Sequence, residues 1–323
     1  MRSFAHINAR TIDEAIALLR RYRGRAVLNA GGTDLLSALK AECLPRYPEA
    51  VINLKTIPDL DYIREDDGSL RIGALARLSG IASSPLVGSN CRVLADAARS
   101  VAGPQIRNAA TIGGNLCQDV RCWYYRYPHH IGGAIQCARK GSGPCLAVKG
   151  DNRYHAIMNG KRCFAVCPSD TAVALAALDA RIHVAGPEGD RTIATIDFFS
   201  PLANALRPGE IVREIEVPKV RTSAVQTFLK FTVREPIDFA IVSVASVVTR
   251  EEGVCTDARI ALGAVAPGPV RAGKAEEVLK GERIDGEIAA RAAEQALAGA
   301  RPLSRNAYKI EIAKTLVKRG ILQ

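Results

Sequence analysis

The stretch AGGTD, residues 30–34, decides how this chain begins to fold, because it joins two regular patterns. The sequence predicts an apolar strand over 26–28 before it and a helix over 33–41 after it. Paired glycines at such a junction let the backbone approach a ligand closely, and the free N–H groups of a helix start suit a phosphate. A third glycine at the spacing of a Rossmann motif is absent. By itself the stretch is therefore better explained as a plain tight turn.

A second pair of glycines occurs in ATIGGN, residues 110–115. Thr111 and Asn115 flank this pair, and their hydroxyl and amide groups suit hydrogen bonds to a phosphate or a ribose. One such element is unremarkable. Two in one chain suggest that they lie on opposite sides of one diphosphate group.

Outward from these elements, helical and strand patterns together predict an α+β fold. Thr11 and Glu14 form a capping box at the start of the first helix. We expect a domain boundary at Pro218, which gives domains at 1–217 and 218–323. The other predicted helices cover 91–101, 171–178, 286–299 and 304–319, and the predicted strands cover 51–54, 181–185, 210–217, 225–233, 240–249 and 257–265.

The bulk composition is that of an ordinary globular protein. The chain has 323 residues, enough for roughly two or three domains, and 48% of them are hydrophobic. No apolar run approaches the ~20 residues that span a bilayer, and the N-terminal stretch carries no secretory signal, so we expect a cytoplasmic protein without a membrane partner. The net charge of +11 comes from dispersed Lys and Arg residues, without a nucleic-acid-binding motif. A solvated basic surface is favoured over a docking face for acidic partners.

Cysteine provides a stronger chemical signal than charge. Six of the nine cysteines lie between residues 117 and 167, in a stretch with little periodicity. A cytosolic chain keeps its thiols reduced, so such a group indicates metal or redox chemistry and not disulfides. A long irregular segment inside a compact domain is usually functional or held by a bound group. The nine are Cys43, Cys91, Cys117, Cys122, Cys137, Cys145, Cys163, Cys167 and Cys255.

Together, AGGTD and RNAATIGGN resemble the flavoprotein subunit of the molybdenum hydroxylases, a family that includes the medium subunit of carbon monoxide dehydrogenase and the FAD domain of xanthine dehydrogenase. The resemblance covers essentially the whole chain. It implies a two-part FAD-binding domain of the vanillyl-alcohol oxidase type at 1–217, and at 218–323 a smaller domain of antiparallel sheet and helices. In this family both glycine elements bind the FAD diphosphate. The residues thereby assigned to FAD are Leu28, Asn29, Ala30, Gly31, Gly32, Thr33, Asp34, Thr111, Gly113, Gly114 and Asn115.

Two further segments resemble the flavin-bearing part of that family. Pro168-Ser169-Asp170 resembles a Ser-Asp pair before a helix, in which the Asp lies near the flavin. Lys230 and Arg234 resemble a Lys-x-x-x-Arg pair, and a cation there would stabilise a reduced, anionic flavin. Without the family context, Lys230 is better explained as a lysine on the surface of a strand.

The pattern Cys122-x14-Cys137-x7-Cys145-x17-Cys163 resembles the insertion of the 4-hydroxybenzoyl-CoA reductase β subunit, which binds a 4Fe–4S cluster. The resemblance extends to GGNLCQDVRC and KGDNRYHAI and places the insertion at about residues 117–167. Four thiolates suffice for a cubane cluster. Zinc with four cysteines is the other chemical option, but its usual short CxxC pairs are absent.

Neighbouring residues are expected to support these sites. Cys167 is the alternative to Cys163 as the fourth ligand, and His155 is expected to support the insertion. Cys117 directly follows the second glycine element and is expected to pack there. The isolated Cys43, Cys91 and Cys255 are expected to behave as small buried hydrophobic residues. A water-excluding shield for a cluster would come from Trp123, Tyr124, Tyr125 and Tyr127.

The resemblance implies an electron-transfer subunit that carries FAD and a 4Fe–4S cluster but no catalytic residues for the substrate. Substrate chemistry would occur at a molybdenum cofactor on a large partner chain, a small chain would bring two 2Fe–2S clusters, and the family suggests a dimer of heterotrimers. The nearest resemblance implies reductive dehydroxylation of 4-hydroxybenzoyl-CoA to benzoyl-CoA, with electrons from ferredoxin. The alternative is a flavoprotein subunit of a xanthine, N-heterocycle or aldehyde dehydrogenase. A hypothesis of another class is a zinc-binding scaffold whose glycine elements are ordinary turns.

Overall fold

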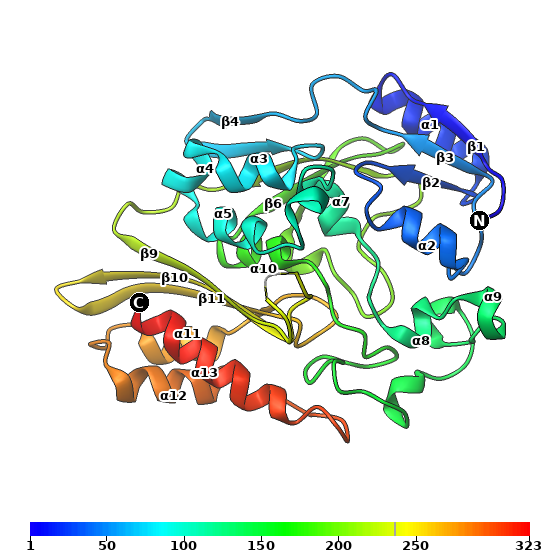
Figure 1. Cartoon of the computed structure of the whole chain (residues 1–323). Coiled ribbons are helices and arrows are strands. Elements are labelled where there is room, and N and C mark those ends of the chain that lie inside the picture. Colours follow the sequence, from blue (N-terminus) through cyan, green and yellow to red (C-terminus); the bar gives the residue numbers. More distant parts are fainter. Residues whose placement is uncertain (236) are drawn as a thin grey trace.

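The computed structural model describes residues 1–235 and 237–323, which form three β-sheets with helices packed between and around them (Figure 1). One sheet is parallel and two are antiparallel, and this mixture confirms the predicted α+β fold. Each sheet is associated with its own hydrophobic cluster. No helix among the described residues is both long and apolar enough to cross a membrane.

The N-terminal sheet is parallel and carries the first glycine element at the end of a strand. Thr11 caps the first helix as predicted, because its hydroxyl oxygen accepts a 3.0 Å hydrogen bond from the Glu14 N–H. The strand that precedes the glycines ends at Asn29, so residues 30–34 leave the sheet at its carboxyl edge, where α/β sheets usually bind ligands. In sheet order the strands are β1 (Ala5–Asn8), β3 (Ala50–Asn53) and β2 (Ala26–Asn29), joined by α1 (Ile12–Tyr22) and α2 (Leu35–Ala41).

The helix after the first glycine element begins at Leu35, later than the predicted start at Thr33. Asp34 occupies the N-cap position, but its side chain makes no capping hydrogen bond. Its carboxylate instead pairs with Arg121 and Arg126, which lie far along the chain. A local sequence pattern does not contain such partners, so it could not show where the helix begins.

The middle sheet is antiparallel, and one of its helices is buried on every side. This helix, α10 (Asp170–Ala177), packs against both α5 and the strands of the C-terminal sheet, so that it lies between two layers. All its residues are buried, as expected for a helix without a polar face. In order, the strands are β4 (Ile63–Asp66), β5 (Ser69–Gly73), β8 (Ile211–Val217), β6 (Arg181–Ala185) and β7 (Arg191–Ala194), and the other helices are α3 (Leu78–Ser83), α4 (Pro85–Asn90) and α5 (Arg92–Arg99).

The C-terminal sheet is also antiparallel and is covered by the last three helices (Figure 1). The predicted boundary at Pro218 falls in the connection between β8 and the first strand of this sheet. The predicted helix at 304–319 begins only at Tyr308, because Ser304 and Asn306 hydrogen-bond to the cysteine-rich segment. The strands, in order, are β12 (Val270–Arg271), β11 (Val254–Gly263), β10 (Val242–Glu251) and β9 (Ala224–Phe231), and the helices are α11 (Gly273–Leu279), α12 (Gly286–Ala296) and α13 (Tyr308–Leu322).

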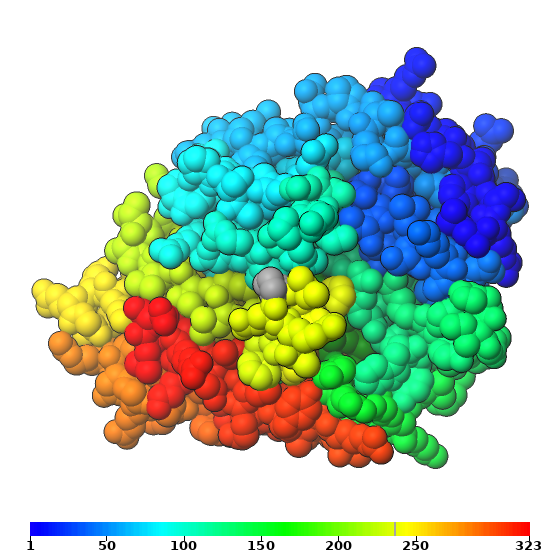
Figure 2. Space-filling model, viewed as in Figure 1, coloured from blue at the N-terminus to red at the C-terminus, as the bar shows by residue number. Residues whose placement is uncertain are grey.

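The cysteine-rich segment between residues 117 and 167 contains only short helical turns. Figure 2 shows it (green) on the surface between the N-terminal part (blue) and the start of α13 (red). The second glycine pair, Gly113-Gly114, lies just before it, in the first turn of a short helix. The helices of this region are α6 (Pro104–Arg107), α7 (Ile112–Cys117), α8 (Trp123–Arg126) and α9 (His129–Gly132), followed by 3₁₀ turns at Ala138–Lys140 and Leu146–Val148.

Candidate cofactor sites

A cavity of about 880 Å³ lies between the two glycine elements, and we call it the dinucleotide cavity. This volume is within the range of cavities that hold cofactors and other small molecules. Every residue that the family resemblance assigned to FAD, from both glycine elements and from the later segments, lines this cavity. They are Leu28, Asn29, Ala30, Gly31, Gly32, Thr33, Asp34, Thr111, Gly113, Gly114, Asn115, Asp170 and Lys230.

The two glycine elements touch each other directly. A Cβ atom on Gly31 would lie 2.2 Å from the carbonyl oxygen of Ala109, so only glycine permits this contact. Gly32 has a φ of +73°, a left-handed conformation that favours glycine. Beside them, the Asn29 side-chain oxygen is buried without a hydrogen-bond partner among the described residues. A close backbone approach next to an unsatisfied polar atom fits a bound dinucleotide.

The side chains of the second element hold it in place. The Thr111 hydroxyl oxygen accepts a 3.2 Å hydrogen bond from the Gly114 N–H and caps α7. The Asn115 side-chain oxygen accepts 2.6 Å hydrogen bonds from the hydroxyl groups of Ser169 and Thr171, at the start of α10. We expected both side chains to bind a phosphate or ribose, but the Thr111 oxygen caps α7 and the Asn115 oxygen fixes the element against α10. Sequence analysis missed this role of Ser169 and Thr171.

Asp170 and Lys230 form a buried ion pair in the cavity wall. The Lys230 Nζ lies 2.6 Å from an Asp170 carboxylate oxygen and also donates to the Ser100 carbonyl oxygen at 2.9 Å. Burial raises the pKa of the Asp170 carboxyl, and the Lys230 charge opposes that change. Lys230 thus carries its positive charge next to a balancing carboxylate. Arg234, expected beside it, is exposed and pairs with Asp238 at 2.8 Å.

A second, much smaller cavity of about 20 Å³, which we call the cysteine cavity, is lined by the four cysteines of the predicted cluster, Cys122, Cys137, Cys145 and Cys163. It is about large enough for one water molecule. Among the described residues, no group of three or more His, Cys, Asp or Glu side chains could hold a metal ion in its present arrangement. A hydrogen bond between sulfur atoms lowers the pKa of Cys145 to about 6 and raises that of Cys163.

The other cysteines lie elsewhere. Cys167, the alternative fourth ligand, lines a neighbouring cavity with Pro168 and Ser169. Cys117 is exposed and lines the dinucleotide cavity. The three isolated cysteines are buried, as the sequence predicted for Cys43, Cys91 and Cys255.

Side chains of the C-terminal domain support the small cavity. His155 Nε2 lies 3.3 Å from Cys122 Sγ, and Trp123 packs edge-on against the His155 ring. The side chains of Asn306 and Lys309 donate to the His155 carbonyl oxygen at 3.0 and 3.1 Å. Burial lowers the pKa of His155 to about 4 and that of Lys309 to about 7.

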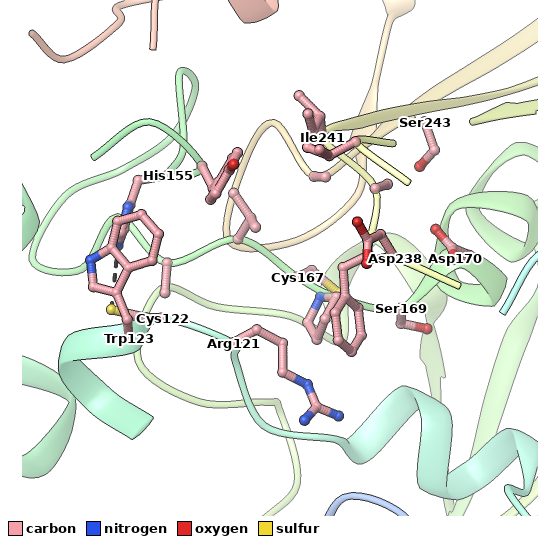
Figure 3. A pocket seen from close by; sticks show the side chains of 18 of the residues that line it. Arg121, Cys122, Trp123, His155, Cys167, Ser169, Asp170, Asp238, Ile241 and Ser243 are labelled. Atoms are coloured by element: carbon pink, nitrogen blue, oxygen red, sulfur yellow. Dashed lines mark hydrogen bonds between the residues drawn. The ribbon is translucent and has the colours of Figure 1, made fainter. Parts of the chain in front are cut away.

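A third cavity, of about 390 Å³, lies between the two sites (Figure 3). It shares Pro168 and Asp170 with the dinucleotide cavity and Cys122 with the cysteine cavity. Arg121, labelled in Figure 3, lines both the third cavity and the dinucleotide cavity, and its guanidinium lies over the Phe239 ring at 4.6 Å. The third cavity thus adjoins both the dinucleotide cavity and the cavity formed by the four cysteines.

The fold and the large cavity are those expected of a flavoprotein with a two-part FAD-binding domain. Two family models match nearly the whole chain: the FAD binding domain in molybdopterin dehydrogenase matches residues 2–220, and the CO dehydrogenase flavoprotein C-terminal domain matches residues 227–323. The chain therefore belongs to the family of FAD-binding subunits of molybdenum hydroxylases, and it is an oxidoreductase subunit.

Individual relatives agree with this assignment. The chain is 33% identical to the aldehyde oxidoreductase FAD-binding subunit PaoB of Escherichia coli, with 97% of this chain and 96% of the relative covered. It is 28% identical to the carbon monoxide dehydrogenase medium chain of Hydrogenophaga pseudoflava, covering 98% and 96%. A structure of carbon monoxide dehydrogenase from that organism matches with a TM-score of 0.80 and 28% identity, covering 99% and 96%. The expected family and its FAD cofactor are thereby confirmed.

Proposed function

We propose that this chain is an electron-transfer subunit that binds a 4Fe–4S cluster in addition to FAD. The observation that carries the proposal is the convergence of Cys122, Cys137, Cys145 and Cys163 on one cavity. A third cavity adjoins both this one and the dinucleotide cavity. Four cysteines suit a thiolate-bound cluster. The cavity is small, so the sulfur atoms must move apart to enclose a cubane. The thiols must also stay reduced, which favours a reducing compartment such as the cytoplasm.

The chain's own residues hold the cofactors in place and exclude water. The two glycine elements would bind the FAD diphosphate, and the Asp170–Lys230 pair would lie at the flavin end of the cavity. His155 contacts Cys122 and Trp123 packs against His155, and such a shell would lower solvent access and tune a cluster's reduction potential. Bound FAD would supply the exchange between two-electron and one-electron transfer.

We further propose the partners that the family resemblance implies. A large chain would carry the molybdenum cofactor and the substrate, and a small chain would carry two 2Fe–2S clusters, in a dimer of heterotrimers. In support, the relatives are named as subunits or as a medium chain.

The direction of electron flow has two candidates. The cysteine pattern favours reduction of 4-hydroxybenzoyl-CoA with electrons from ferredoxin. The 33% identity to an aldehyde oxidoreductase subunit favours oxidation of an aldehyde, or of an N-heterocycle such as a purine, with electrons leaving through FAD. The test is an assay of the purified complex with reduced ferredoxin and 4-hydroxybenzoyl-CoA, and separately with aldehydes and N-heterocycles plus an electron acceptor. Turnover of only one of these two groups of substrates decides the direction of electron flow.

A zinc site in place of the cluster is the competing hypothesis, because four cysteines also suit zinc. The family assignment already excludes a scaffold without a flavin. Metal analysis of the anaerobically purified complex separates the two. Iron beyond that of the small subunit's clusters supports the proposal, whereas zinc in stoichiometric amount would overturn it.

A further inference from the structure

The first glycine element is joined to the cysteine-rich segment through the carboxylate of Asp34. One oxygen of this carboxylate lies 2.7 Å from the Arg126 guanidinium and 3.0 Å from that of Arg121. The other oxygen accepts a 2.8 Å hydrogen bond from the Asp119 N–H. Both oxygens of Asp34 are therefore bonded to residues of the cysteine-rich segment.

The same contacts continue to the cysteine cavity. Arg126 also donates to the carbonyl oxygens of Val120 and Asp119, at 2.8 and 3.1 Å. The Asp119 carboxylate pairs with Arg139 at 2.8 Å and accepts a hydrogen bond from the Tyr125 hydroxyl. Arg139 and Tyr125 line the cavity formed by the four cysteines. A continuous polar network thus leads from the dinucleotide cavity to the cysteines.

The position of Asp34 does not suit direct binding of a dinucleotide. A carboxylate facing a diphosphate would repel it, because like charges at short range are unfavourable. Two guanidinium groups instead hold the carboxylate, and its side chain is only 17% exposed. The Arg126 side chain is 14% exposed. Charge pairs with little access to water hold their geometry better than exposed pairs.

We infer that Asp34 is a positioning residue, which fastens the cysteine-rich segment to the first glycine element and thereby couples FAD binding to occupation of the cysteine site. The part concerning occupation rests on the proposed cluster. Order in the segment would hold the glycine element in its binding conformation. By thermodynamic reciprocity, bound FAD would raise the affinity of the cysteines for iron by the same factor.

A double-mutant cycle on the full-length chain tests the role of Asp34 without reference to iron. The variants are Asp34→Asn, Arg126→Gln and both together, and the measurement is the dissociation constant of FAD. We expect each single variant to bind FAD about tenfold more weakly than the unaltered chain. The double variant should bind FAD as well as the single variant with the lower affinity, because both substitutions remove the same link. Arg121→Gln, a milder change, should weaken binding about threefold.

The control is Asp190→Asn, which breaks an exposed pair with Arg213 and should leave FAD binding unchanged. Effects of Asp34→Asn and Arg126→Gln that multiply in the double variant would overturn the inference, because Asp34 would then act on the dinucleotide by itself. A loss of FAD binding in the control, or no loss in either single variant, would overturn it as well.

The second experiment compares FAD binding to the iron-loaded chain and to the same chain after iron chelation. We expect FAD to bind about tenfold more tightly to the loaded chain, and this ratio to fall to about one in Arg126→Gln. If the unaltered chain takes up iron but binds FAD equally well with and without it, the coupling is overturned and the proposed cluster is not affected. If the chain takes up no iron, the proposed cluster is ruled out. The double-mutant cycle alone then decides whether Asp34 positions the cysteine-rich segment.

Discussion

The dinucleotide cavity and the cysteine cavity are built in opposite ways. The first is formed by backbone, with Gly31 packed against Ala109 and a parallel sheet behind it. The second is formed by side-chain sulfur atoms on a segment of short turns, and neighbouring side chains such as Lys309 hold that segment in place. The large cavity has room for its cofactor, whereas the small one must open.

This difference indicates how each site depends on its ligand. Backbone that is fixed by sheet and helix hydrogen bonds keeps its shape without a bound cofactor. A metal site on an irregular segment usually gains much of its order from the metal, so that binding energy contributes to folding. We therefore expect substitutions at the cysteines to act first on metal content, and on flavin affinity only through the coupling inferred above. Substitutions at the glycines should act directly on flavin affinity.

The largest expected effect comes from the cysteines. Cys122→Ser, Cys137→Ser, Cys145→Ser or Cys163→Ser should each remove the iron, because a cubane needs all four thiolates, while FAD still binds at saturating concentration. Iron and flavin analysis of each variant is the measurement. Cys255→Ser, in a buried position far along the chain, is the control and should keep its iron.

Cys167→Ser sharpens the same experiment by testing the fourth ligand. It should retain iron, because Cys167 lines a neighbouring cavity and not the one formed by the other cysteines. Iron loss in this variant together with retention in Cys163→Ser would show that the ligand assignment is wrong.

The next effect concerns the buried ion pair in the dinucleotide cavity. Lys230→Met should lower the free energy of unfolding by about 3–5 kcal/mol, because it leaves the Asp170 carboxylate buried without its partner. Denaturant unfolding of the full chain measures this. Lys230→Met combined with Asp170→Asn should recover most of the loss, and no recovery would contradict the pairing.

A smaller effect is expected at the contact between the glycine elements. Gly31→Ala should weaken FAD binding about 100-fold, because a crowded contact costs about 1–3 kcal/mol and the added Cβ would lie 2.2 Å from the Ala109 carbonyl oxygen. Gly80→Ala is the matched control, because nothing lies within 4 Å of a Cβ there. Equal FAD affinity in both variants would show that the contact between the two glycine elements tolerates a side chain at residue 31.

The smallest effect is a pH dependence from Lys309, which supports the cysteine-rich segment. Burial lowers its pKa in the folded chain to about 7, from the 10.5 that is usual for lysine. Between these values the unfolded chain binds the proton more tightly, so stability should increase as pH rises above 7. From pH 7 to 8.5 we expect a gain of about 1–2 kcal/mol. In Lys309→Met that contribution should vanish, and an unchanged slope would contradict the assignment.

The two glycine elements line one cavity, as we expected for opposite sides of one ligand, because glycine permits close backbone approach. Their role in binding FAD, which the family resemblance implies, stays a prediction. The motifs at 30–34 and 110–115 both line the cavity, as do Asp170 and Lys230. The sequence predicted neither the link from Asp34 to Arg126 nor the one from Asn115 to Ser169, because polar partners far apart in sequence leave no periodic signal. The sequence did not predict short elements such as β1, β7 and α11, because they are too short to show a hydrophobic periodicity.

For the cysteine site, spacing and family resemblance selected four of the six cysteines between 117 and 167, and these four line one cavity. Their role as cluster ligands stays a prediction. The supporting contacts of His155 with Asn306 and Lys309 could not be predicted, because they join the insertion to residues at and just before the start of α13, more than a hundred residues away.

The cofactor content of the full chain, isolated without oxygen, tests most directly the claim that one chain holds both FAD and an iron–sulfur cluster. We predict a full complement of FAD together with about four iron atoms per chain. FAD without iron, or with zinc in its place, would contradict the claim.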